Sequence, residues 1–181
     1  MTDRLLAIVV CGAGPAAQVG ILVDLAHERG WRTQIIATPS ALPFLDLAAL
    51  EEQTGRQVRS DYRTPEEPRS SEQATGFIVA PATFNTINKL TSGISDTYAL
   101  GVLGEAIGAG SAVVIVPFIN TALANRLPLQ ESIRRLKSEN VSILGADHGN
   151  APHPPHTGSA VIGAYPWQRA LTELERRLAG L

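Results

Sequence analysis

The chain lacks features that several protein classes require. Of its 181 residues only Cys11 is a cysteine, so no internal disulfide framework of the kind found in small secreted domains can form. No apolar run approaches the roughly 20 residues of a membrane-spanning helix. The net charge is −2, so the chain has no basic excess to attract nucleic acid or an anionic membrane. We therefore expect a cytoplasmic protein with neither nucleic-acid nor membrane partners.

What the chain does have is a regular alternation of apolar runs and amphipathic segments. Hydrophobic residues make up 44 % of the sequence, and the length suits one domain spanning residues 1–181. Continuous apolar runs are typical of strands buried on both faces. We expect an α/β fold of the Rossmann or flavodoxin type, an open parallel sheet of about six strands with helices on both faces. The strands are predicted near residues 5–11, 32–37, 57–60, 75–80, 112–116 and 141–144.

Near the C-terminus, residues 147–160 hold His148, His153 and His156 among prolines. One hypothesis is a metal site or a proton donor, and the other is an exposed flexible loop. Prolines impose extended backbone and no further ligand is near in the sequence, so we predict no metal here. Residues 165–179 predict a C-terminal helix.

The first predicted strand ends in a glycine-rich turn, Gly12-Ala13-Gly14. Bare backbone N–H groups at the start of a helix, together with the helix dipole, favour an anion. The turn therefore predicts a phosphate site, with a plain tight turn as the alternative. Because it lacks the GxGxxG spacing, it does not indicate a dinucleotide.

The central turn of the chain follows the apolar run Phe77–Ala80. Pro81 is expected to end this strand, since proline cannot donate to the ladder. The small polar residues Thr83, Asn85 and Thr86 come next, followed by a helical pattern. Open α/β sheets bind ligands at such turns, where hydroxyls, an amide and free N–H groups can face one ligand.

The turn Pro81–Thr86 resembles the PASANT motif of the homo-oligomeric flavin-containing cysteine decarboxylases, differing by Thr83 for Ser and Phe84 for Ala. That family includes phosphopantothenoylcysteine decarboxylase and peptidyl-cysteine decarboxylases. The following Gly93–Asp96 is similar to the family's G-I-x-D, and Pro117–Asn120 keeps the Pro and Asn of its P-x-M-N motif. The resemblance extends in order over about residues 5–146.

This resemblance implies flavin mononucleotide (FMN) as the cofactor, a small-molecule substrate, and a homotrimer or a multiple of trimers. Asn85 and Asn120 are the candidate catalytic residues, and the alternative is that each is a turn residue capping a helix. Thr38 and Ser40 fall where the family has a hydroxyl near the phosphate, although either could be a plain helix cap. The implied cofactor-binding residues are Gly12, Ala13, Gly14, Thr38, Ser40, Thr83, Phe84, Asn85, Thr86 and Phe118.

The chain departs from the family at its catalytic groups. The family's histidine before the central strand falls near Glu67 here, its Met is Ile119, and Cys11 does not correspond to its C-terminal cysteine. We therefore expect a flavin-dependent enzyme, a decarboxylase-like lyase or an oxidoreductase, on an unidentified small substrate. The alternatives are a catalytically silent flavin-binding or regulatory protein, and a decarboxylase of a cysteinyl substrate with a non-standard acid–base group. Phe118 stands where a flavin prenyltransferase would be expected to have an Arg, which argues against that relative.

The segment Thr97–Ile107 predicts a helix that is apolar on nearly every side, with Glu105 as its one charge. A lone surface helix usually keeps a charged outer face. The pattern therefore predicts that this helix contacts its own sheet on one side and a second copy of the chain on the other. The alternative is a helix buried wholly within one domain.

Overall fold

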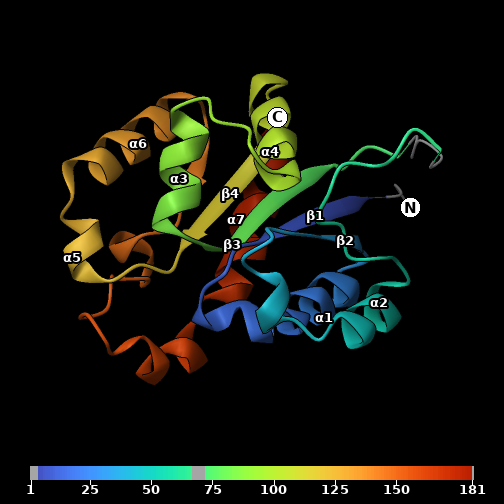
Figure 1. Cartoon of the computed structure of the whole chain (residues 1–181), viewed down its shortest axis with the longest axis horizontal. Helices are drawn as coiled ribbons and strands as arrows, with labels where there is room; N and C mark the ends of the chain where they lie inside the picture. Colours follow the sequence, from blue (N-terminus) through green and yellow to red (C-terminus); the bar gives the residue numbers. More distant parts are fainter. Residues whose placement is uncertain (1–3, 67–71, 181) are drawn as a thin grey trace.

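In the computed structural model, which describes residues 4–66 and 72–180, a parallel sheet lies between two layers of helices (Figure 1). The sheet has five strands in the order β2-β1-β3-β4-β5. This confirms the predicted α/β class and is the doubly wound order of flavodoxin-like proteins. The strands are β1 Leu5–Val10, β2 Arg32–Ala37, β3 Gly76–Ala82, β4 Ala112–Pro117 and β5 Ser142–Ile143.

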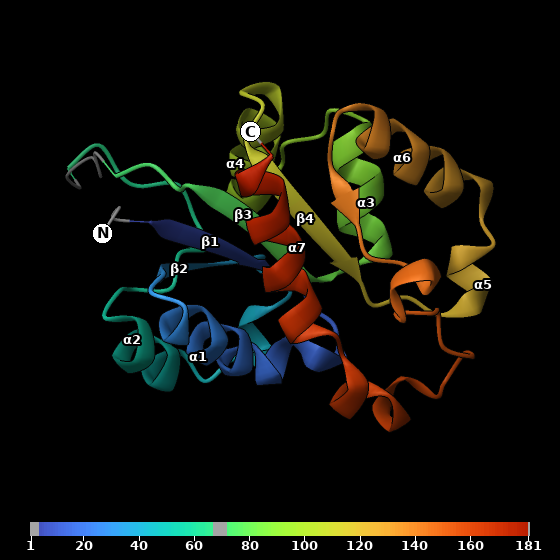
Figure 2. The same ribbon diagram turned by 180° about the vertical axis from the view of Figure 1, so that it is seen from behind.

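The helices divide between the two faces of the sheet, and the view from behind shows α7 lying across it (Figure 2). No helix within residues 4–66 and 72–180 is both long enough and apolar enough to cross a bilayer. One face carries α1 Gly20–Glu28, α2 Leu47–Thr54 and α7 Trp167–Ala179. The other face carries α3 Phe84–Thr91, α4 Tyr98–Gly108 and α6 Leu127–Ser138, and the short α5 Thr121–Ala124 follows β4.

Strand β1 shows why the apolar runs of this sequence form such a sheet. Because successive side chains point to opposite faces, Leu6 and Ile8 belong to the core beneath α1 and α7. Ala7 and Val9 belong to the second core beneath α3 and α4. All six residues of the strand are buried, so both of its faces favour apolar side chains, which gives the continuous apolar run of the sequence.

The predicted strand at 57–60 is wrong, and the sheet has five strands where about six were expected. In that segment only Arg59 pairs with the sheet, through an isolated bridge to Ile36. The Arg59 N–H donates to Ile35 O at 3.0 Å, and the Ala37 N–H donates to Arg59 O at 2.7 Å. Its side chains are mostly polar, so a longer pairing would bury little apolar surface.

Strand β3 continues through Pro81 to Ala82, so the prediction that Pro81 ends it is also wrong. The Ala80–Pro81 peptide bond is cis, and the β3–β4 register shifts between Val79 and Ala82. Proline is tolerated where the ladder is already irregular, because no N–H is required there. The Pro81 carbonyl still accepts a hydrogen bond of 3.0 Å from the Cys11 N–H.

Candidate functional site

The turns that follow β1 and β2 lie against each other at the carboxyl edge of the sheet. The Thr38 N–H donates to Val10 O at 2.9 Å, which holds the second turn beside the first. A Cβ atom on Gly12 would lie 2.4 Å from the backbone oxygen of Ser40, so only glycine fits there. The Thr38 and Ser40 hydroxyls are 3.2 Å apart. The structure thus brings Gly12, Thr38 and Ser40 together.

The rest of the glycine turn enters a short 3₁₀ helix, Gly14–Gln18, before α1 begins. Ala13 precedes it in an extended conformation, and no side chain caps this helix. A Cβ atom on Gly14 would lie 2.9 Å from Ile162 Cδ1 and 3.5 Å from Phe118 Cε1. Phe118 and Ile162 therefore cover the turn. The sequence carries no local signal for Ile162, which reaches this place through long-range packing.

The central turn uses its hydroxyls internally and leaves its amide available. Thr83 caps α3 by accepting a hydrogen bond from the Thr86 N–H at 3.3 Å, and the Thr83 and Thr86 hydroxyls are 3.0 Å apart. Phe84 is half-buried and Asn85 is exposed. The Asn85 side chain forms no hydrogen bond to any residue that the structure describes, so it is not a helix cap.

At the end of β4, Asn120 does cap a helix. Its Oδ1 accepts a hydrogen bond of 2.9 Å from the Leu123 N–H at the start of α5. The capping alternative therefore holds for the oxygen of Asn120 and fails for Asn85. No hydrogen bond joins these two asparagines, although they follow neighbouring strands.

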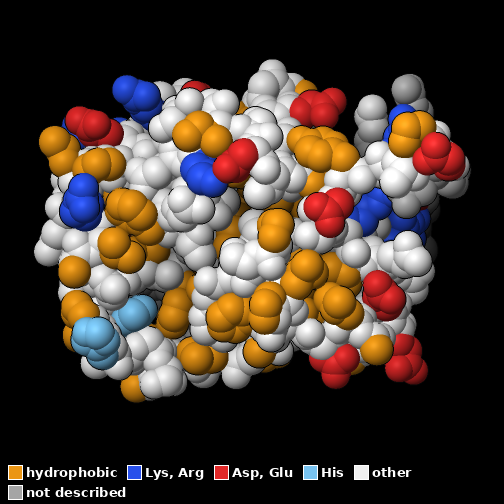
Figure 3. Space-filling model, in the orientation of Figure 1, with side chains coloured by type: hydrophobic (Ala, Val, Ile, Leu, Met, Phe, Trp, Pro, Cys, Tyr) orange, Lys and Arg blue, Asp and Glu red, His pale blue; other side chains and the backbone are white. Residues whose placement is uncertain are grey.

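The segment 145–166, which includes the predicted Pro/His loop, folds over the carboxyl edge of the sheet. Asn150 Nδ2 donates to Pro117 O at 2.8 Å and to Leu144 O at 2.9 Å. The Thr121 N–H donates to His153 O at 2.8 Å. Histidine side chains appear among hydrophobic ones at the lower left of the space-filling view, below the position that α5 has in Figure 1 (Figure 3). Within residues 4–66 and 72–180 no three His, Cys, Asp or Glu side chains are grouped as metal ligands.

A buried tyrosine anchors this covering segment. The Tyr165 hydroxyl donates to Val116 O at 2.6 Å. Its ring centroid lies 6.0 Å from that of Phe118 and 4.6 Å from that of Trp167, edge to face in both pairs. Burial raises the pKa of Tyr165 well above its ordinary value, and the nearby Cys11 adds to the shift. The phenol is therefore held in its neutral, donating form.

Cys11 lies beneath the central turn with almost no exposed surface. Burial raises the pKa of its thiol, while hydrogen bonds from the Thr86 side chain and the Thr83 backbone partly offset the increase. Since the thiolate is the reactive form, the raised pKa and the burial both disfavour reaction of this cysteine at neutral pH. The structure supports its interpretation as a small core residue.

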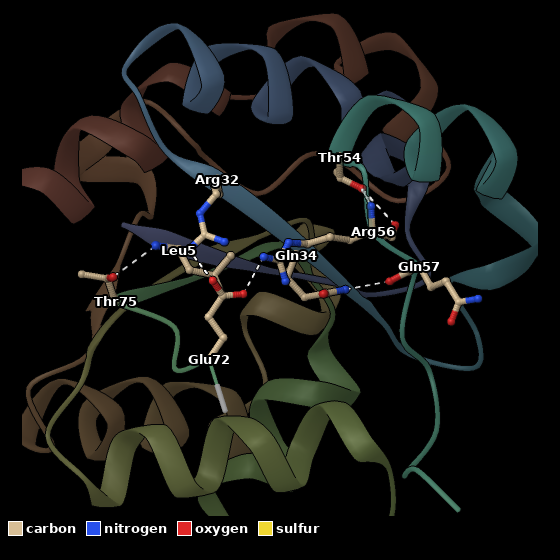
Figure 4. A network of polar contacts seen from close by, with 8 residues as sticks. All are labelled: Leu5, Arg32, Gln34, Thr54, Arg56, Gln57, Glu72 and Thr75. Carbon is tan, nitrogen blue, oxygen red and sulfur yellow. Dashed lines mark hydrogen bonds and ion pairs between the residues drawn. The ribbon is translucent and has the colours of Figure 1, made fainter. Parts of the chain in front are cut away.

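A separate cleft of about 540 Å³ lies on the sheet face beside α4. Polar residues stand on one of its sides, where Glu72 forms ion pairs with Arg32 and Arg56 (Figure 4). These two guanidinium groups, Arg32 first, lower the pKa of the Glu72 carboxyl. None of the predicted site residues lines this cleft. Glu67, at the place of the family's histidine, lies outside the described residues.

A family model described as Flavoprotein matches residues 2–162. The chain belongs to the Flavoprotein family. Family membership supports a flavin cofactor. A curated relative, the coenzyme A biosynthesis bifunctional protein CoaBC of Borreliella burgdorferi, is 27 % identical over 152 residues. The match covers 81 % of this chain and 38 % of that protein, so the chain spans well under half of the relative's length.

Solved structures of Flavoprotein-like fold agree over nearly the whole chain. A PPC decarboxylase mutant complexed with pantothenoylaminoethenethiol is 18 % identical, with a TM-score of 0.70 over 94 % of this chain and 99 % of that one. The FMN-dependent cysteine decarboxylase SpaF is 23 % identical, with a TM-score of 0.65 over 94 % and 98 %. The FMN-binding protein AtHal3 is 18 % identical, with a TM-score of 0.69 over 90 % and 94 %. At these identities the similarity establishes the fold.

The buried phenol predicts how stability depends on pH. Because the folded-state pKa of Tyr165 is raised, the unfolded chain releases this proton first, near the ordinary value of 10.0. Stability is therefore retained below that pH and falls above it, by about 1.4 kcal/mol per pH unit for one proton. Below this pH the Tyr165→Phe variant should be less stable than the unsubstituted protein by about 1 kcal/mol. Above it, the free energy of unfolding of the variant should fall less steeply as the pH rises. Denaturant unfolding across this range measures the slopes.

The control is Tyr62→Phe at an exposed position. Its free energy of unfolding should fall with pH as steeply as that of the unsubstituted protein. Cys11 also has a raised pKa and adds its own slope in every variant. Equal slopes for Tyr165→Phe and the unsubstituted protein would contradict the assignment of this slope to Tyr165.

Proposed function

We propose that the chain binds FMN at the carboxyl edge of β1, β3 and β4 and is a flavin-dependent, decarboxylase-like enzyme acting on a small substrate. The observation that carries the proposal is the meeting of the glycine turn, the Thr38–Ser40 hydroxyls and the central turn at the β1–β3 boundary. In a doubly wound sheet this boundary is where the strand order reverses and where ligands bind. The names of SpaF and AtHal3, which specify FMN, support the choice of flavin.

The residues present fit a flavin nucleotide. Because Gly12 has no Cβ, its backbone packs directly against the backbone of Ser40, which brings the N–H groups of the glycine turn and the Thr38 and Ser40 hydroxyls to one place, as an anion site requires. Backbone N–H groups of Gly12–Gly14 and the hydroxyls of Thr38 and Ser40 suit the phosphate. When bound, FMN would supply one- and two-electron redox chemistry.

The central turn suits the ring of the flavin. Asn85 has an unused amide that can donate and accept hydrogen bonds, and Thr83, Phe84 and Thr86 surround it in the sequence. Phe118 offers an apolar surface over the glycine turn. Asn120 keeps its side-chain N–H groups for a substrate, since only its oxygen caps α5.

A catalytically silent flavin-binding protein is the second candidate. The observation that favours it is the replacement of two family groups, with Glu67 at the histidine's place and Ile119 at that of Met. Turnover of any small substrate by the flavin-loaded protein would rule it out.

We predict that the purified protein binds FMN, with the absorption bands of a bound flavin and altered fluorescence. Asn85→Asp should weaken binding by placing a carboxylate beside the ring. Gly12→Ala should weaken it far more than Gly14→Ala, because the first Cβ would meet backbone and the second the movable end of Ile162. Circular dichroism separates lost binding from lost folding. Absence of binding at micromolar protein would overturn the proposal.

We predict that phosphopantothenoylcysteine is decarboxylated at well below a family-like rate. A positioned acid–base group is worth about 10²–10⁴-fold in rate, and Glu67 replaces the histidine that supplies it. Release of carbon dioxide from this substrate by the FMN-loaded protein is the measurement. Rapid release would show that the replacement is harmless.

We predict a homotrimer or a multiple of it, with α4 at the contact. The inner side of α4 is buried, whereas Gly104, Glu105 and Gly108 are exposed beside the 540 Å³ cleft. Small residues allow another backbone to approach closely. Light scattering should give three times 19.2 kDa or a multiple, and a persistent monomer with flavin bound would contradict this.

Gly104→Gln tests the contact directly. A Cβ there would meet nothing nearer than Ser95 Oγ at 3.9 Å, so the single chain can accommodate the side chain. The variant should therefore keep its fold while losing association.

A further inference from the structure

The structure brings a histidine from the far end of the chain to the candidate site. His153 forms an isolated parallel bridge with Asn120, and its carbonyl accepts the Thr121 N–H at 2.8 Å. The backbone of His153 is therefore fixed next to Asn120, at the end of β4. Nothing in the local sequence indicates this pairing.

The ring of His153 is held on both sides. Its centroid lies 4.8 Å from that of Phe118, with the ring planes tilted by 38°. A Cβ atom on Gly158 would lie 3.1 Å from His153 Cε1 and 3.3 Å from its Nε2. The imidazole thus sits between an aromatic ring and a close backbone, which limits its rotation.

The hydrogen bond of the ring fixes its tautomer. His153 Nδ1 lies 2.9 Å from Pro154 O, and a carbonyl oxygen can only accept, so Nδ1 carries the proton. In the neutral ring Nε2 then has the free lone pair. Nε2 has no hydrogen-bond partner in the part of the chain that the structure describes.

The other histidines of the loop differ. His148 Nδ1 lies 2.9 Å from Asp147 Oδ1 and forms a pair with that carboxylate. His156 is exposed and has a positive φ of 66°. Among these three, His153 alone combines a held ring, a defined tautomer and contact with Phe118.

We propose that His153 is the general acid–base residue of this site. The inference rests on the proposed function. Neutral Nε2 would accept the proton of a thiol or hydroxyl on a substrate beside Asn120, giving the substrate anion and an imidazolium whose Nδ1–H remains bonded to Pro154 O. The same proton would return to the product.

With this assignment, the site has a histidine although the chain lacks the one that the family carries before the central strand. The family's histidine precedes the central strand, where this chain has Glu67. His153 approaches instead from the β4 side. A proton acceptor there would serve a substrate held differently from phosphopantothenoylcysteine.

The tautomer can be measured without a substrate. In ¹⁵N ring spectra of the labelled protein, assigned with His153→Asn, we expect His153 to carry its proton on Nδ1. Adding FMN should shift the His153 ring signals and leave those of His156 unchanged. A proton on Nε2, or no response of His153 while FMN binds, would overturn the inference. Failure of FMN to bind would instead defeat the proposed function.

Proton transfer is tested by a simple thiol. Under anaerobic conditions dithiothreitol is oxidised to its disulfide and the bound flavin takes up the two electrons. His153→Asn should slow this bleaching about 10²-fold, the lower end of what acid–base help is worth, and added imidazole should restore part of it. His156→Asn is the matched control, since asparagine tolerates positive φ, and should bleach at the unsubstituted rate.

Flavin affinity should be unchanged in both variants, which separates a catalytic from a structural effect. Equal bleaching by His153→Asn and the unsubstituted protein, or no bleaching by either, would overturn the assignment.

Discussion

The fold depends on β1 being buried on both faces between β2 and β3. A strand in that position needs helices on both faces of the sheet, and the chain supplies α1 and α7 on one face and α3 and α4 on the other. Parallel strands under such a constraint all end at one edge. The turns after β1, β2, β3 and β4 are therefore neighbours, whatever their separation in the sequence.

Whether a strand of this sheet can be predicted from the sequence depends on whether both of its faces are buried. Strands that are buried on both faces can be predicted because their sequences are continuous apolar runs, as in Leu5–Val10 and Ala112–Pro117. Segment 57–60 does not fit that criterion, and only Arg59 of it pairs with the sheet. The prediction that Pro81 ends its strand is wrong because proline's missing N–H does no harm where the β3–β4 register is already irregular.

The candidate site likewise contains some residues that a local sequence pattern predicts and others that it does not. Turn chemistry predicts the glycine turn and Thr83–Thr86 as parts of the candidate site, because the groups that these segments offer belong to their own backbone and short side chains. The parts that cover the edge, Ile162, Tyr165 and His153, arrive by long-range packing and have no local signature. Even among predicted residues, sequence could not separate the capping role of Asn120 from the free amide of Asn85, since the distinction depends on which neighbour caps the helix.

The attachment of segment 145–166 to β4 has a consequence for the order of assembly. N-terminal segments emerge first during synthesis, so the glycine and threonine turns exist before the residues that cover them. Asn150 and Tyr165 then fasten the cover to carbonyl groups of Pro117 and Val116. A ligand enclosed beneath that cover could be retained only by a chain that has finished folding, so ligand retention would report on the completeness of each newly made molecule.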